Sequence, residues 1–168
     1  SFRIPCDGTV VPDSLDGITN VLGGFLPRPD MIVTSGGAWG SERDLVVGAL
    51  DRLGWRRLFH YVRMGPGKGV AFGLLGDVPV FCLPGGPTSN MAAFLHLALP
   101  AIFLMCGDTR PPLPVIHATL TTDVRGRQAD WTEFMDASIT PDGAGRYTVS
   151  PSRNTSRLQS IACADGYL

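Results

Sequence analysis

The sequence lacks a charge excess, a cysteine motif and a repeat. Its 14 lysines and arginines nearly balance 15 aspartates and glutamates, for a formal net charge of −1. It therefore offers no basic surface for nucleic acid. The four cysteines include no CxxC pair and no metal-ligand spacing, which predicts reduced thiols in the core of a cytoplasmic protein.

An uninterrupted apolar run of the length that we expect of a membrane span is also missing. The longest apolar stretch, Met91 to Met105, is interrupted by His96 and Pro100. We therefore expect a buried helix there and no membrane span. We recognise no signal peptide, and Phe2 to Pro5 resembles the middle of a strand, so we expect the chain to begin inside a domain.

Glycine and proline, by contrast, are abundant, with 21 and 14 copies, and they indicate many specified turns. Ser35-Gly36-Gly37 follows an apolar strand at 31–34 and precedes a predicted helix at 42–53. The segment Leu83 to Ser89 likewise follows a strand at 78–83 and opens a helix. Unpaired N–H groups at helix starts favour anions. The two turns predict one anionic ligand at the edge of a sheet.

The order of predicted elements is typical of an α/β fold. We expect a helix at 13–25, then the strand and helix above, and then strands at 58–64, 70–75 and 78–83. This order predicts a mostly parallel sheet. The prolines of 107–112 indicate an interdomain linker. Beyond it, short polar-apolar runs predict a small β barrel or sandwich, so we expect domains at 1–107 and 112–168.

Three residues near the glycine turns have two possible roles each. Lys68, in the loop 65–69, offers an ammonium to phosphate or is a solvated residue of a hairpin turn; the spacing is not that of a Walker A loop. Asp44 either favours a helix N-terminus or holds Mg²⁺ together with substrate phosphate oxygens. Trp39 either covers a planar heterocycle or packs at a rim. The three histidines show no metal spacing.

Together, these motifs resemble those of one family. The segments 12–13, 30–44 (DMIVTSGGAWGSERD), 65–73 (GPGKGVAFG), 83–89 (LPGGPTS) and 164–166 occur in the order seen in molybdopterin molybdenumtransferases, the MoeA family that includes the gephyrin E domain. The resemblance covers nearly the whole chain. It implies a three-layer molybdopterin-binding α/β fold that lacks its start, followed by a small all-β, barrel-like domain.

The resemblance also implies an activity, the insertion of molybdate into adenylylated molybdopterin with release of AMP and assistance from Mg²⁺. It assigns catalytic roles to Asp44 and Lys68, and metal binding to Asp44. It implies a homodimer in the complete protein, with the catalytic cleft shared across it. The ligand-binding residues that it implies are Asp13, Thr34, Ser35, Gly36, Gly37, Gly67, Pro84, Gly85, Ser89 and Arg127.

The chain departs from the family pattern at several positions. Gly65 replaces a lysine, Gly86 replaces an asparagine, and Trp39-Gly40-Ser41 replaces a serine-valine-glycine loop. Two further family domains are absent from the sequence. We therefore expect the isolated chain to be inactive. Two alternatives stay open: a non-catalytic pterin- or nucleotide-binding or scaffold homologue, and a molybdopterin adenylyltransferase, against which the segment after Gly107 argues.

Overall fold

The computed structural model describes residues 4–26, 29–38, 44–152 and 157–168. The predictions made for Trp39, Gly40 and Ser41 lie outside the described residues. The first sheet contains four strands in the order β1-β5-β4-β2: β1 (Ile32–Ser35), β2 (Arg56–His60), β4 (Ala71–Leu75) and β5 (Val78–Leu83).

This sheet is mixed, so the expectation of a mostly parallel sheet is wrong. β1 runs parallel to β5, whereas β4 is antiparallel to both β5 and β2. The physical reason lies in the turn at Gly76-Asp77, which leaves no residues for a crossover between β4 and β5. A two-residue connection can join only antiparallel strands.

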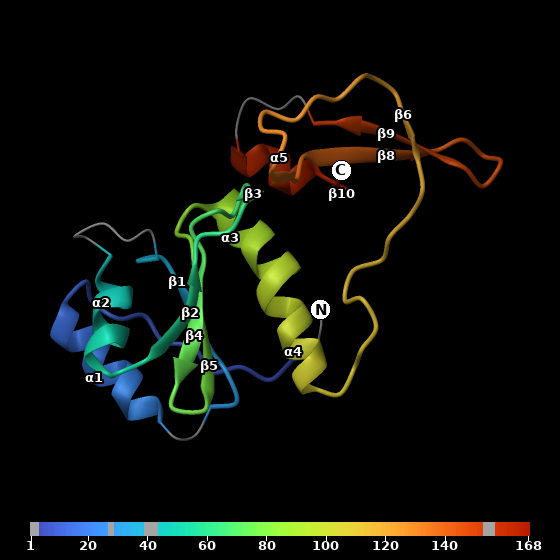
Figure 1. Ribbon diagram of the computed structural model, residues 1–168. Coiled ribbons are helices and arrows are strands. Elements are labelled where there is room, and N and C mark those ends of the chain that lie inside the picture. Colours follow the sequence, from blue (N-terminus) through green and yellow to red (C-terminus); the bar gives the residue numbers. More distant parts are fainter. Residues whose placement is uncertain (1–3, 27–28, 39–43, 153–156) are drawn as a thin grey trace.

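Helices cover both faces of the sheet and give three layers (Figure 1). On one side lie α1 (Leu15–Phe25) and α2 (Leu45–Arg52); on the other lies a continuous helical stretch of α3 (Pro87–Ala93), η1 (Phe94–Ala98) and α4 (Leu99–Met105). Successive side chains of β5 point to opposite faces of the sheet and contribute to two separate hydrophobic cores. Val80 and Cys82 pack with the α1–α2 side, while Phe81 and Leu83 pack with Ala93 and Ala98.

The helix expected at 13–25 is confirmed, and its start is set by Ser14. Ser14 has extended backbone angles, and its hydroxyl accepts a hydrogen bond from the Gly17 N–H at 3.1 Å. This is the usual chemistry of a helix N-cap. Two apolar side chains of this helix, Ile18 and Leu22, are buried.

The helix from Pro87 to Met105 differs from the expectation of a short, broken and buried segment. It is 19 residues long, and by length and composition it could cross a membrane, as could a core helix. Pro100 has no N–H to donate within the helix. The π-helical turn η1 lies directly before it, and there the Leu99 N–H donates to the Phe94 carbonyl, five residues earlier. One face, with Ala98 and Leu99, is buried, whereas Leu104 and Met105 are exposed.

In the C-terminal part that the structure describes, a helix accompanies the strands and the sheet does not close into a barrel. Its strands follow the order β10-β8-β9-β6: β6 (Thr119–Leu120), β8 (Asp136–Pro141), β9 (Tyr147–Pro151) and β10 (Gly166–Tyr167). The helix α5 (Arg157–Cys163) precedes β10. The two outer strands, β10 and β6, have only two residues each, and each pairs with one inner strand and not with the other outer one, so the described sheet is open. The predicted domain boundaries stay a prediction.

A small parallel pair joins the C-terminal part to the first part. β3 (Met64–Gly65) pairs with β7 (Thr132–Glu133), and the Phe134 N–H donates to the Gly65 carbonyl at 2.8 Å. Next to this pair, the rings of His96 and Phe134 stack with centroids 3.8 Å apart. The C-terminal part therefore lies beside β3 and α3 (Figure 1).

The expectation of core thiols holds for one cysteine only. Cys82 is buried, whereas Cys6, Cys106 and Cys163 are exposed. Burial raises the pKa of the Cys82 thiol to about 12, against a smaller opposite effect of the Thr34 hydroxyl. The Cys82 thiol is therefore protonated and shielded at any physiological pH.

We predict that iodoacetamide at pH 8 modifies three thiols rapidly in the native protein and the fourth only after unfolding. The thiolate is the reactive species, and Cys82 forms almost none when folded. Mass spectrometry of the protein alkylated with and without guanidinium chloride measures the number of modified cysteines. Rapid native modification of Cys82 would contradict the buried β5 position.

We also predict an acid-sensitive contribution from His96. Burial lowers the pKa of its imidazole, so the folded state favours the neutral ring. As the pH falls below about 6.5, the unfolded chain gains a proton that the folded chain resists. The free energy of unfolding of wild type should fall relative to His96→Phe between pH 7 and 5. The exposed His117, changed to Phe, is the control and should leave this pH dependence unchanged.

Candidate functional site

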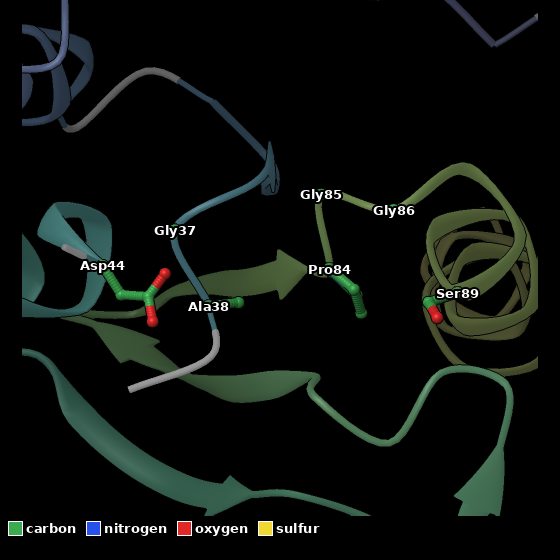
Figure 2. A pocket seen from close by; sticks show the side chains of 7 residues that line it. All are labelled: Gly37, Ala38, Asp44, Pro84, Gly85, Gly86 and Ser89. Atoms are coloured by element: carbon green, nitrogen blue, oxygen red, sulfur yellow. The ribbon is translucent and has the colours of Figure 1, made fainter. Parts of the chain in front are cut away.

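A cavity of about 330 Å³ lies where the parallel strands β1 and β5 end. Because both strands point to the same edge of the sheet, the two glycine turns that follow them meet there. The residues that line the cavity are Gly37, Ala38, Asp44, Pro84, Gly85, Gly86 and Ser89 (Figure 2). The structure thus confirms that the two turns predicted from the sequence adjoin one another.

The first turn requires glycine at two positions. Gly36 and Gly37 have φ angles of 92° and 68°, in the region that favours glycine. A Cβ on Gly37 would lie 2.7 Å from Val46 Cγ2 of α2. The Gly36 N–H donates to the Leu83 carbonyl at 3.0 Å. The turn therefore packs tightly against α2 and stays bonded to the end of β5.

The second turn lies directly against the first. A Cβ on Gly85 would come within 3.5 Å of Gly36 Cα. Gly86 is the N-cap of α3 and Pro87 its first residue, and no side chain caps this helix end. Pro87 needs no partner there because it has no N–H. The turn presents backbone and the Ser89 side chain to the cavity.

Asp44 provides the carboxylate of the cavity. It occupies the N-cap position of α2, one residue before the helix, and its side chain makes no capping hydrogen bond. In Figure 2 the carboxylate lies on the α2 side of the cavity and Ser89 on the α3 side. Among the described residues, no group of three or more potential ligands could hold a metal alone. One carboxylate suits Mg²⁺ only when a substrate adds oxygen ligands.

The lysine loop is not part of the cavity lining. Lys68 is exposed, and its Nζ lies 5.3 Å from the ring centroid of Trp131 and 5.9 Å from that of Tyr61. Gly67 has a φ angle of 113°, in the region that favours glycine, and a Cβ there would force the end of the Met64 side chain, 2.6 Å away, to move. The catalytic role of Lys68 and the binding role of Gly67 stay predictions.

Three other residues that the family resemblance implied also lie away from the lining. Asp13 is exposed just before α1. Thr34 is on β1 opposite Cys82. Arg127 has a side chain that is 92% exposed, and its N–H donates to Glu133 Oε1 at 2.6 Å. Ser35 and Gly36 are not among the residues that line the cavity, although they directly precede Gly37, which is.

Two residues that support the cavity were missed in the sequence. The His60 Nε2 donates to the Ala38 carbonyl at 2.7 Å, so β2 holds the chain beyond the first turn. The Asn90 side chain bonds to both turns. A polar residue at the start of an apolar helix was the available signal for Asn90, whereas His60 gave none.

Comparisons with known proteins find similarity to molybdenum cofactor biosynthesis proteins. The family model described as "Probable molybdopterin binding domain" matches residues 5–103. The chain is 34% identical over 168 residues to "Molybdenum cofactor synthesis protein cinnamon" of Drosophila melanogaster, covering 98% of this chain and 28% of that protein. It is 32% identical to "Molybdopterin molybdenumtransferase 1" of Mycobacterium tuberculosis, covering 71% of this chain and 29% of that protein.

Solved structures show the same fold. A MoeA protein from Pyrococcus horikoshii matches with a TM-score of 0.71 and 24% identity, over 95% of this chain and 37% of that chain. A molybdenum cofactor biosynthesis protein from Pyrococcus furiosus also gives 0.71, with 22% identity, over 95% of this chain and 49% of that chain. The chain spans less than a third of the length of the two curated relatives.

We predict that Gly37→Ala lowers the free energy of unfolding by at least ~1–3 kcal/mol, because the new methyl group meets Val46 in a left-handed backbone conformation. Urea unfolding measures the change. Gly24→Ala is the matched control: Gly24 lies within α1 with open space at its Cβ position, so alanine should be neutral or stabilising. Equal effects of the two substitutions would contradict the packing of the first turn.

Proposed function

The chain belongs to the MoeA family of molybdenum cofactor biosynthesis proteins, and from this premise we propose that it forms the molybdopterin-binding part of a molybdopterin molybdenumtransferase. Its substrate site is the cavity between the two glycine turns. The observation that carries the proposal is the adjacency of these turns. They lie so close that a Cβ added to Gly85 would be only 3.5 Å from Gly36 Cα. The glycines of the two turns have no side chains, so the backbone there can approach a phosphate closely.

The proposed reaction inserts molybdate into adenylylated molybdopterin and releases AMP. The phosphate groups of this substrate would lie against the glycine turns, with Ser89 at the α3 side. Asp44 would repel them unless a divalent cation were bound, so Asp44 and substrate oxygens would together hold Mg²⁺. When bound, the cation would neutralise charge that develops on the phosphate oxygens. The complete protein would act as a cytoplasmic homodimer.

One observation favours a second function, ligand binding without turnover. Among the described residues, the cavity lining includes one charged side chain, that of Asp44, and Lys68 lies outside the lining beside Trp131. Gly86 brings no side chain to a position where the family carries asparagine. A site with few oriented polar groups binds an anion through its backbone but stabilises a transition state poorly.

Calorimetry with AMP tests the site. Gly36→Val should weaken AMP binding more than tenfold, about 1.4 kcal/mol, because the side chain would stand where backbone must approach phosphate. Gly24→Ala in α1 serves as the control and should bind as wild type does. Equal affinity of wild type and Gly36→Val would place the ligand elsewhere.

An activity assay separates the two functions. The intact protein should convert adenylylated molybdopterin and molybdate to active cofactor in the presence of Mg²⁺, and Asp44→Asn should lower the rate at least tenfold while shifting the Mg²⁺ dependence. The 168-residue chain alone should bind AMP without turnover. AMP binding by an intact protein that shows no turnover would support the binding function instead. Unchanged activity of Asp44→Asn would remove this carboxylate from the mechanism.

A further inference from the structure

We propose that Asn90 is a positioning residue that holds the two glycine turns in register and orients the Ser35 hydroxyl toward the ligand. This inference rests on the proposed function of the cavity as a phosphate-binding site. Asn90 lies in α3 and does not itself line the cavity. Its effect on a ligand is therefore exerted through the groups that it bonds.

The carboxamide of Asn90 connects both turns. Its Nδ2 donates to the Pro84 carbonyl at 2.8 Å and to Ser35 Oγ at 3.0 Å. The Asn90 backbone N–H donates to the Gly86 carbonyl at 2.8 Å. One residue thus bonds to the second turn twice and to the first turn once, across 55 positions of sequence.

The chemistry of these partners fixes the orientation of the amide. A carbonyl oxygen can only accept, so the group that faces Pro84 must be the NH₂ end. An NH₂ group has two hydrogens, one for each acceptor. Pro84 is buried, and a buried carbonyl without a donor is costly. These demands hold the side chain in one conformation.

The bond to Ser35 has a consequence for the ligand. Because Ser35 Oγ accepts from Asn90, its own hydrogen stays able to be donated to another oxygen. Ser35 is the first residue of the first turn and directly precedes Gly36. Ser35 is two residues before Gly37, which lines the cavity, and a hydroxyl held there by a fixed donor is positioned to bond a phosphate oxygen before the ligand arrives. Such preorganisation lowers the entropy cost of binding.

The backbone bond between Gly36 and Leu83 already joins the turns, so a purely structural role for Asn90 makes a different prediction. If Asn90 only stabilised the fold, its removal would lower the melting temperature and leave the AMP affinity of the folded protein unchanged. If it orients Ser35, the effects of the two residues on affinity must be coupled. A double-mutant cycle measures that coupling.

The experiment measures AMP binding by calorimetry on the intact protein, with melting temperatures recorded for each variant. Asn90→Ala should weaken binding roughly five- to tenfold, as expected for lost oriented hydrogen bonds. Ser35→Ala should weaken it similarly. In the Ser35→Ala background, Asn90→Ala should cost less than about twofold. Asn20→Ala, an exposed position on α1, is the control and should bind as wild type does.

Asn90→Asp provides a second variant of nearly the same shape. An ionised carboxylate cannot donate to Pro84 or Ser35 and adds a negative charge near the anion. It should weaken AMP binding more than Asn90→Ala does, and added salt should narrow the difference. Wild-type affinity of a folded Asn90→Asp protein would overturn the inference.

The outcomes also separate this inference from the proposed function. If Gly36→Val weakens AMP binding but Asn90→Ala does not, or if the Asn90 and Ser35 effects are additive, the role of Asn90 is overturned while the site stands. If wild type binds no AMP, or if Gly36→Val binds as wild type does, the site and the role of Asn90 are both overturned.

Discussion

The parallel pairing of β1 with β5 is the constraint on which the site depends. Four residue pairs, from Ile32–Val80 to Ser35–Leu83, set the register, and the Gly36 N–H continues the hydrogen bonding beyond the strands. Because parallel strands end at the same edge, this pairing brings together two turns that are far apart in the sequence. A shift by one residue would move the side chains of β5 to the wrong core.

Packing around the first turn places the rest of the cavity. Gly37 lies so close to Val46 that no side chain fits between them, and this contact brings the start of α2, with Asp44, to the cavity. On the other side, α3 begins at the second turn and carries Ser89 and Asn90. Backbone approach sets this geometry, and few side chains of the lining contribute to it.

The C-terminal part influences the lysine loop more than the cavity. β3 and β7 pair on one side of this loop, and Trp131 lies 5.3 Å from the Lys68 ammonium. Attraction between a cation and an aromatic ring, of about 0.5–1 kcal/mol at exposed sites, favours this position. A ligand that needs the lysine must compete with Trp131 and with Tyr61 for the ammonium.

The sequence by itself determined the local structure: the helix α1, the two glycine turns and the family. Each of these depends on residues that are close together in the chain, which is why short patterns reveal them. Tertiary structure decided the strand directions, the open C-terminal sheet, the position of Lys68 outside the cavity lining and the Asn90 bonds to both turns. These features depend on which distant segments meet, because a hydrogen bond such as that between Asn90 and Ser35, 55 positions apart, leaves no periodic signal in the sequence.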